Sequence, residues 1–166
     1  GVAVVRRATS GAVLLEGRPI SGFSRPEIAC RLSYLPQNTW TDFDVSVADA
    51  VGMGRLPYLG AWRAMRKEDF EAVEVAMRRV GLAHLASRTL PTLSGGERRR
   101  TEIARALVLD PQFVLLDEPF AGIDPLAVID IQNIIRHLKD RGIGVLVTDH
   151  NVRETLEITD RAYIIH

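Results

Sequence analysis

Short apolar runs alternate with longer amphipathic stretches along most of this chain, and this alternation limits the fold more than any other feature. Four-residue apolar runs favour strands, and stretches with an apolar residue every three or four positions favour helices. We expect strands at residues 12–15, 32–35, 113–116, 144–147 and 162–165. The last three are almost wholly apolar, as buried parallel strands are. The sequence therefore predicts an α/β fold with a parallel-sheet core.

The amphipathic stretches predict helices at residues 47–53, 67–80, 97–108, 126–139 and 152–157. Ser24, Ser94 and Asn151 each stand three positions before a glutamate, the spacing of a capping box. Asp124 precedes a proline, which marks another helix start. The segment between the second and third strands is mostly helical. We therefore expect residues 1–37 and 106–166 to form the sheet core and residues 38–105 an inserted helical subdomain.

The overall charge gives no reason to expect a nucleic-acid partner. Basic and acidic residues number 21 each, so the net charge is zero. We interpret Arg98, Arg99 and Arg100 as a solvated helix face rather than a nucleic-acid patch. The single cysteine, Cys30, fits a reducing compartment, and no apolar run approaches the roughly 20 residues that span a bilayer. We expect a cytoplasmic protein that meets the inner membrane only as a peripheral subunit.

Two carboxylates, Asp117 and Glu118, end the apolar strand at residues 113–116. Ligands of parallel sheets bind beyond the carboxyl ends of the strands. Consecutive strand residues face opposite ways, so one carboxylate can serve a metal ion while the other acts on a water molecule. For the isolated pair, an acidic turn that closes a core strand is the alternative interpretation.

A second chemical signal is the turn Ser94, Gly95, Gly96 and Glu97, which opens a helix. Backbone N–H groups and the positive end of the helix favour an anion there, and two glycines let a phosphate approach closely. Taken alone, such a turn is more often a simple helix start.

The segments LSGGERRR, LLDEP, AGID and TDH, in this order and spacing, resemble the signature motif, Walker B motif, D-loop and switch histidine of ABC ATPases. YLPQ resembles their Q-loop. The resemblance covers the chain from about residue 10 to its end. It implies a P-loop NTPase fold of the ABC ATPase type, ATP and Mg²⁺ as cofactors, and a nucleotide-binding subunit that couples ATP hydrolysis to transport.

The resemblance also implies a role for each motif residue. Asp117 corresponds to the carboxylate that holds Mg²⁺ through water, and Glu118 to the general base that polarises the attacking water. His150 corresponds to the γ-phosphate contact, and Gln37 to the residue that links the metal site to the transporter. The alternatives are a loop histidine that caps the next turn and a solvated glutamine. Implied roles at the interface of two domains are binding of the opposite subunit's nucleotide by Ser94, Gly95, Gly96 and Glu97, and communication across the dimer by Asp124.

One family motif has no counterpart among these residues, the phosphate-binding G-x-x-x-x-G-K-[ST] loop. The only lysines are Lys67 and Lys139, and neither follows a glycine or precedes Ser or Thr. Residues 1–5 correspond best to the end of the helix that follows this loop. We therefore expect a truncated domain lacking the first strands, weak or absent Mg-ATP binding by the isolated chain, negligible turnover, and open sheet edges that favour homo-oligomers.

The two parts of the chain resemble different subfamilies. Residues 10–90 resemble ATPases of ferric-siderophore, haem and cobalamin importers, and residues 93–166 resemble the ATPase of the lipopolysaccharide exporter. We interpret the chain as a chimera, natural or built, with a single divergent lineage as the alternative. Because the family's membrane subunit docks near the Q-loop and the helical subdomain, we expect an importer-like permease and a second nucleotide-binding domain as partners.

Two further hypotheses compete with a transporter subunit. The first is a non-enzymatic structural or engineered fragment that keeps only the fold. The second is part of a chromosome-maintenance or DNA-repair ABC ATPase. The second is disfavoured because those proteins place a long coiled coil before the signature, whereas Gln37 and Leu93 are only 56 positions apart with no sustained heptads.

Overall fold

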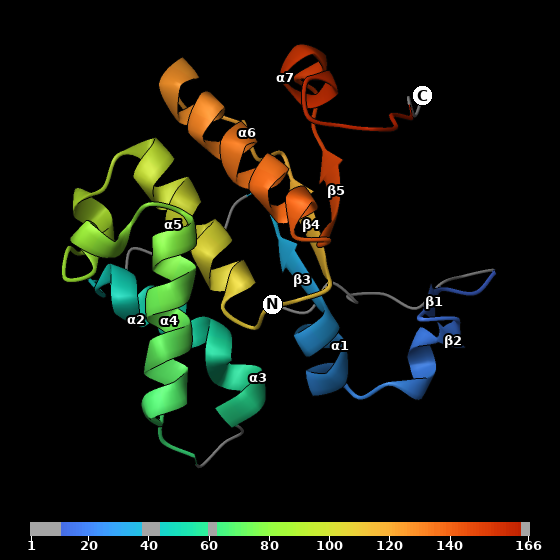
Figure 1. Ribbon diagram of the computed structural model, residues 1–166, viewed down its shortest axis with the longest axis horizontal. Helices are drawn as coiled ribbons and strands as arrows, with labels where there is room; N and C mark the ends of the chain where they lie inside the picture. Colours follow the sequence, from blue (N-terminus) through green and yellow to red (C-terminus); the bar gives the residue numbers. More distant parts are fainter. Residues whose placement is uncertain (1–10, 38–43, 60–62, 164–166) are drawn as a thin grey trace.

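The computed structural model describes residues 11–37, 44–59 and 63–163, and its centre is a parallel sheet. The strands lie in the order β3 (Leu32–Leu35), β4 (Phe113–Asp117) and β5 (Gly144–Thr148), as Figure 1 shows. Three of the predicted strands are thereby confirmed. The register pairs Leu35 with Leu116, and Asp117 with Thr148. All three strands therefore end at the same edge, where ligands of parallel sheets bind.

Helices cover one face of this sheet, and within the described ranges they make up most of the chain between β3 and β4 (Figure 1). Their bounds agree with the sequence prediction to within two residues at each end, with two exceptions. For α1 (Arg25–Arg31) only the start was predicted, by the Ser24 capping box, and α3 (Leu56–Leu59) was not predicted. The others are α2 (Val47–Gly52), α4 (Lys67–Arg79), α5 (Gly95–Leu107), α6 (Pro125–Asp140) and α7 (Val152–Leu156). None of the helices in the described ranges is long and apolar enough to cross a bilayer.

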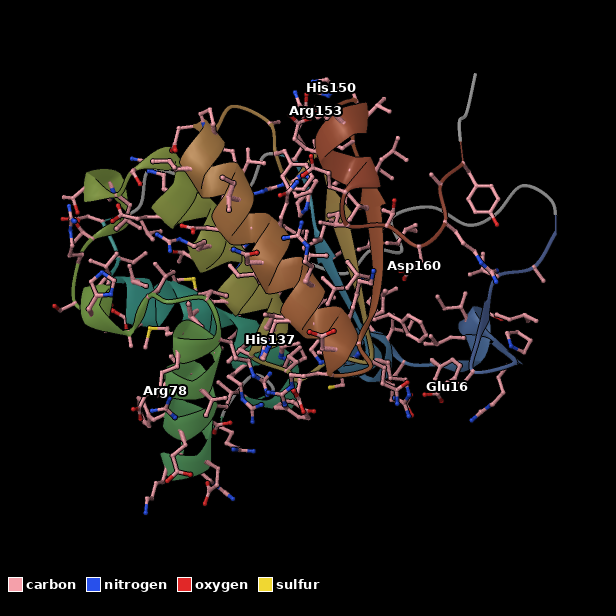
Figure 2. All side chains as sticks on the ribbon, turned by 45° about the horizontal axis from the view of Figure 1, so that its top comes forward. Glu16, Arg78, His137, His150, Arg153 and Asp160 are labelled. Carbon is pink, nitrogen blue, oxygen red and sulfur yellow. The ribbon has the colours of Figure 1, made fainter. Side chains whose placement is uncertain are left out.

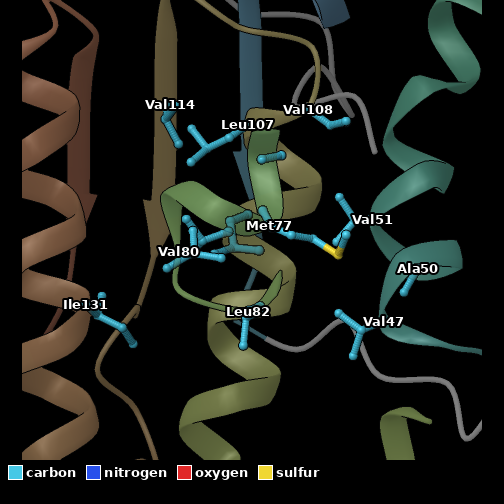
Figure 3. Close-up of a cluster of buried hydrophobic side chains, with 14 of the residues drawn as sticks. Val47, Ala50, Val51, Met77, Val80, Leu82, Leu107, Val108, Val114 and Ile131 are labelled. Atoms are coloured by element: carbon cyan, nitrogen blue, oxygen red, sulfur yellow. The ribbon is translucent and has the colours of Figure 1, made fainter. Parts of the chain in front are cut away.

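A single hydrophobic cluster joins the helical insertion to the sheet (Figure 3). Val51 of α2, Met77 of α4 and Leu107 of α5 belong to it together with Val114 of β4, and each is at most 5% exposed. Burial of such side chains contributes about 1.5–3 kcal/mol each to folding. The insertion is therefore packed as part of the same core as β4, whose end carries the two carboxylates.

The helices nearest the carboxylates begin with the predicted caps. The Ser94 hydroxyl accepts a hydrogen bond from the Glu97 backbone at 3.2 Å, and the Glu97 carboxylate accepts one from the Ser94 backbone at 2.7 Å. The Asp124 carboxylate accepts from the backbone N–H groups of Leu126 and Ala127 at 3.1 and 3.0 Å. The Ser24 capping box is confirmed as well.

Three sequence predictions about helices and strands were wrong, at least in part. The Asn151 side chain makes no capping hydrogen bond at the start of α7. The strand predicted at residues 12–15 is confirmed only at its end, where β1 (Leu14–Leu15) pairs with β2 (Arg18–Pro19) in an antiparallel hairpin outside the parallel sheet. Both loop residues have positive φ, 52° at Glu16 and 73° at Gly17, as the favoured hairpin turn requires. Residues 162 and 163 are not in a strand, and the rest of the predicted strand at 162–165 lies outside the described residues.

Candidate functional site

Three predicted site residues meet at the carboxyl edge of the sheet, each from the loop after a different strand. Gln37 follows β3, Glu118 follows β4 and His150 follows β5. The Gln37 amide nitrogen donates a hydrogen bond to Glu118 Oε2. His150 Nδ1 lies 3.6 Å from the other carboxylate oxygen, Glu118 Oε1. Figure 2 shows His150 where the chain passes from β5 into α7. The parallel sheet thus gathers around one carboxylate three side chains that are far apart in sequence.

The backbone at Glu118 takes a conformation that L-residues rarely adopt. Its φ is 46°, in the left-handed region, and its N–H donates to the Thr148 carbonyl oxygen at 2.6 Å. Non-glycine residues in this region are uncommon and cost free energy unless their surroundings hold them. The Glu118 side chain is 28% exposed, so water reaches the carboxylate. A partly exposed carboxylate on a constrained turn is a suitable acceptor for a proton from water.

Asp117 is the last residue of β4, immediately before Glu118. Its carboxylate accepts hydrogen bonds from the Thr148 hydroxyl at 2.6 Å and from the Tyr34 hydroxyl at 3.1 Å. Burial and the hydrogen bond to Asp117 raise the pKa of the Tyr34 phenol. The phenol therefore remains a donor at neutral pH.

Asp149 is a site residue to which sequence reasoning assigned no role, although it lies within the TDH motif. Its side chain is fully buried. One oxygen accepts from the Asn151 N–H at 2.8 Å and the other from the Phe120 N–H at 3.2 Å. Asp149 therefore ties the loop that carries His150 to the turn that follows Glu118.

The prediction that the arginine run is a solvated face was wrong for Arg99, whose side chain is only 6% exposed. Its guanidinium donates to the carbonyl oxygens of Asp117 at 2.8 Å and Glu118 at 2.9 Å. It also donates to those of Pro119 at 3.3 Å and Pro36 at 3.2 Å. Five donors in a rigid fork suit this task. Arg99 thus joins α5 to the carboxylate turn and to the residue before Gln37.

Glu102, one turn further along α5, pairs with Arg99 at 2.8 Å and is 3% exposed. Burial raises the pKa of its carboxyl group. Its other oxygen, Oε1, is buried without a hydrogen-bond partner within the described part of the chain. A buried carboxylate oxygen without a hydrogen-bond partner lowers the stability of the folded state. The ion pair with Glu102 is therefore weak evidence that Arg99 serves only to stabilise the fold. The hydrogen bonds of Arg99 to the carboxylate turn are a more direct reason for a buried arginine at this position.

The turn at Ser94 lies beside the start of α6 rather than against Glu118. A Cβ atom at Gly96 would be 2.4 Å from the Ala127 Cβ and 3.8 Å from Asp124 Oδ2, so the two helix starts touch. Hydrogen bonds from Ser94 lower the pKa of Glu97. In the described ranges, no hydrogen bond runs from this turn to Glu118 or His150, and the connection passes through Arg99.

The side chains at the strand ends fit a magnesium ion that keeps most of its water ligands. Asp117 and Gln37 offer carboxylate and amide oxygens, the ligand type that Mg²⁺ prefers, and nucleotide sites hold this ion through one or two protein ligands plus phosphates. Among the described residues there is no cluster of three or more His, Cys, Asp or Glu side chains that could cage a metal. The donor set therefore fits a metal shared with a phosphate ligand better than a protein-only metal site.

Comparison with known proteins identifies the family. The ABC transporter family model matches residues 2–121. A probable ABC transporter ATP-binding protein of Azorhizobium caulinodans is 47% identical over 163 residues, which is 96% of this chain and 56% of that protein. The chain belongs to the ABC transporter ATP-binding family. Its ATP-binding relatives include LptB of the lipopolysaccharide export system of Acidithiobacillus ferridurans, 48% identical over 96% of this chain and 65% of LptB. The chain thus spans between half and two thirds of the length of these curated relatives.

Solved ATP-binding cassettes share the fold. A nucleotide-free cassette from an ABC transporter gives a TM-score of 0.84 at 25% identity, over 96% of this chain and 67% of that one. CbiO1 of Clostridium perfringens, part of the ABC transporter complex CbiONQ, gives 0.79 at 27% identity over 94% and 62%. The fold is therefore that of P-loop NTPase-like ABC ATPases, with a parallel-sheet core. Members of this family bind ATP and Mg²⁺ and work with membrane permease subunits.

Proposed function

We propose that these residues form the hydrolysis and signature part of the nucleotide-binding subunit of an ABC transporter, in which ATP hydrolysis is coupled to transport. The contact of Gln37 and His150 with the Glu118 carboxylate carries this proposal. Glu118 is the general base that polarises the attacking water, and His150 contacts the γ-phosphate. Gln37 and Asp117 would hold Mg²⁺, which would neutralise charge on the phosphates.

The turn at Ser94 is proposed to act on a second nucleotide-binding domain. Ser94 and Gly95 are exposed, and α5 presents its N–H groups and positive end there, which suits a phosphate. In this proposal Ser94, Gly95, Gly96 and Glu97 bind the nucleotide of the opposite subunit. Asp124, next to Gly96, communicates across the dimer. Residues 38–105 then form the signature subdomain, and 1–37 and 106–166 the catalytic core.

The isolated chain is proposed to bind Mg-ATP in the millimolar range at best. A family site wraps the phosphates with loop N–H groups and a lysine, and these 166 residues contain no such run. Hydrogen bonds to charged groups contribute about 1.5–3 kcal/mol each, so about four of them contribute about 6–12 kcal/mol. A micromolar complex is worth only about 8 kcal/mol. Titration calorimetry tests this. Joining a relative's P-loop segment ahead of residue 1 should give micromolar binding, and micromolar binding by the chain alone would refute the proposal.

We propose an importer-like permease as the membrane partner and a cytoplasmic position at the inner membrane. A largely apolar groove of about 730 Å³ opens beside Pro36, the residue before Gln37, and runs along α1, α3 and α5. Leu56 of α3 lines it and is 60% exposed. In detergent, an importer permease should bind more tightly than an exporter permease. Leu56→Asp should lower its affinity at least tenfold, whereas Phe70→Asp, an equally exposed change outside the groove lining, should not.

We further propose that the two parts of the chain, residues 10–90 and 93–166, derive from different ABC ATPases. An ABC transporter ATP-binding protein of Rhizobium meliloti is 68% identical over 85 residues, 51% of this chain, whereas relatives that match 96% of it are 41–48% identical. Uneven similarity of this kind is what a join predicts. Sequencing the source DNA as single reads across the codons for residues 90–96 tests the natural form of this proposal. One uninterrupted gene in that DNA supports a natural join, and two separate genes would refute it.

A further inference from the structure

The Asp117 carboxylate accepts hydrogen bonds from residues of both strands that neighbour β4. Asp117 ends the central strand β4 and is paired in register with Thr148 of β5, whose hydroxyl donates to Oδ1 at 2.6 Å. On the other side, Tyr34 of β3 is in register with Leu115, two residues before Asp117 and on the same face. The phenol reaches along the strand and donates to Oδ2 at 3.1 Å. Each oxygen thus has a hydroxyl donor from a different neighbouring strand.

We propose that Tyr34 and Thr148 are positioning residues that hold the Asp117 carboxylate in one orientation for the hydrated metal ion. This inference rests on the proposed function for its purpose, although the orientation itself is measurable without nucleotide. Tyr34 lies in the YLPQ segment and Thr148 in the TDH segment, but sequence reasoning assigned no role to either residue.

The acceptor capacity of a carboxylate supports this role. Two ionised carboxylate oxygens offer about four acceptor sites, so one hydroxyl on each oxygen leaves about one site per oxygen facing solvent. Mg²⁺ dehydrates reluctantly and keeps several waters. A carboxylate that is held on both oxygens and still accepts from water is suited to bind that hydration shell rather than the bare ion.

The solvent exposure of these hydrogen bonds indicates that they orient the Asp117 side chain rather than stabilise the fold. Thr148 is exposed and Tyr34 and Asp117 are half-buried, so water competes for all three groups. Hydrogen bonds that water can replace add little net stability. They still restrict the side-chain torsion of Asp117, and a reaction geometry depends on that restriction.

The test uses the isolated 166-residue chain with the isosteric variants Tyr34→Phe and Thr148→Val, singly and together. Three-bond NMR couplings to the Asp117 side chain report its χ1 rotamer. We expect a single rotamer in the parent, partial averaging in each single variant and full averaging in the double variant, with an unchanged urea midpoint. The matched controls Tyr58→Phe and Thr92→Val lie away from the sheet edge and should leave the couplings unchanged. Unchanged Asp117 couplings in the double variant would overturn the inference.

A metal titration separates this inference from the proposed function. This titration uses a parent protein in which a relative's P-loop segment precedes residue 1, because the isolated chain is expected to bind nucleotide weakly. In it, line broadening of the Asp117 signals by Mn²⁺ with excess ATP should need at least tenfold more metal in the double variant than in the parent. If the couplings average as expected but Mn²⁺-ATP leaves the parent signals unaffected, the positioning role stands and the nucleotide function of this site fails. If the parent responds and the double variant responds equally, the positioning role is wrong.

Discussion

The guanidinium of Arg99 donates a hydrogen bond to the carbonyl oxygen of Glu118 at 2.9 Å, from a helix that begins at the Ser94 turn. Glu118 has a positive φ, and a backbone in this conformation persists only where its surroundings hold it. A buried cation beneath the turn supplies such a hold. The relationship links the signature helix to the residue that we propose as the general base.

We expect Arg99→Gln to lower the free energy of unfolding by about 3–5 kcal/mol, because removing one partner leaves the buried Glu102 carboxylate uncompensated. Urea denaturation measures this. Adding Glu102→Gln should recover only part of the loss, since the contacts with the carbonyl oxygens of Asp117 and Glu118 remain absent. Arg136→Gln, which removes only a solvent-exposed hydrogen bond to Asn133, should change stability by no more than about 0.5 kcal/mol. A similar small effect for Arg99→Gln would contradict the structural role.

The fully buried Asp69 predicts a specific acid sensitivity. The Arg66 N–H and the Arg55 and Arg63 guanidinium groups hold its carboxylate and lower its pKa from 3.8 to about 2. A depressed carboxyl pKa contributes stability above the unfolded value, which is lost as pH falls through the folded value. Thermal unfolding followed by circular dichroism should therefore show stability falling from about pH 4 to pH 2. In Asp69→Asn, stability should be lower at neutral pH and its fall over this window shallower.

The matched control for Asp69 is Asp160→Asn, which removes an exposed carboxylate paired with Lys139. This change should leave stability at neutral pH nearly as in the parent. Parallel acid profiles for Asp69→Asn and the parent would show that the buried cluster does not contribute to this pH dependence.

The contact between the two helix starts predicts different results for two adjacent glycines. Gly96→Ala would place a Cβ atom 2.4 Å from that of Ala127, so α5 must move from α6. We expect a loss of about 1–3 kcal/mol, as for other overpacked sites. At Gly95 the nearest atom to a new Cβ is 3.7 Å away, so Gly95→Ala should fall within about 0.5 kcal/mol of the parent. Chemical denaturation of the two variants side by side tests this, and equal losses would contradict the contact.

Much of the site was predictable because its residues follow local rules. The apolar strand before Asp117 and the capping turns at Ser94 and Asp124 can be recognised from the spacing of residues in the sequence. The meeting of Gln37, Glu118 and His150 then follows from the parallel sheet, whose strands end at one edge. Local rules for strands and helix caps, together with the rule that parallel strands end at one edge of the sheet, were sufficient to predict these features.

Other features depend on tertiary contacts that short-range patterns do not carry. The run of three arginines looks solvated, but Arg99 stands three positions after Gly96 and four before Ile103, both buried, so it lies on the core side of α5. That helical spacing was the available signal. The contacts of Tyr34 and Thr148 with Asp117 depend on the strand register, which the sequence does not give. The hairpin after Leu15 depends on a positive φ at Glu16, and a glutamate does not indicate this conformation.

The most direct test of the account is steady-state ATP hydrolysis by a protein in which a relative's P-loop segment precedes residue 1, compared with its Glu118→Gln variant. General-base catalysis contributes about 10²–10⁴-fold. We predict Mg²⁺-dependent hydrolysis in the parent and at least a hundredfold loss of turnover in the variant, with ATP binding retained. Equal turnover in the two proteins would contradict the assignment of Glu118 as the general base and, with it, the proposed function of the site.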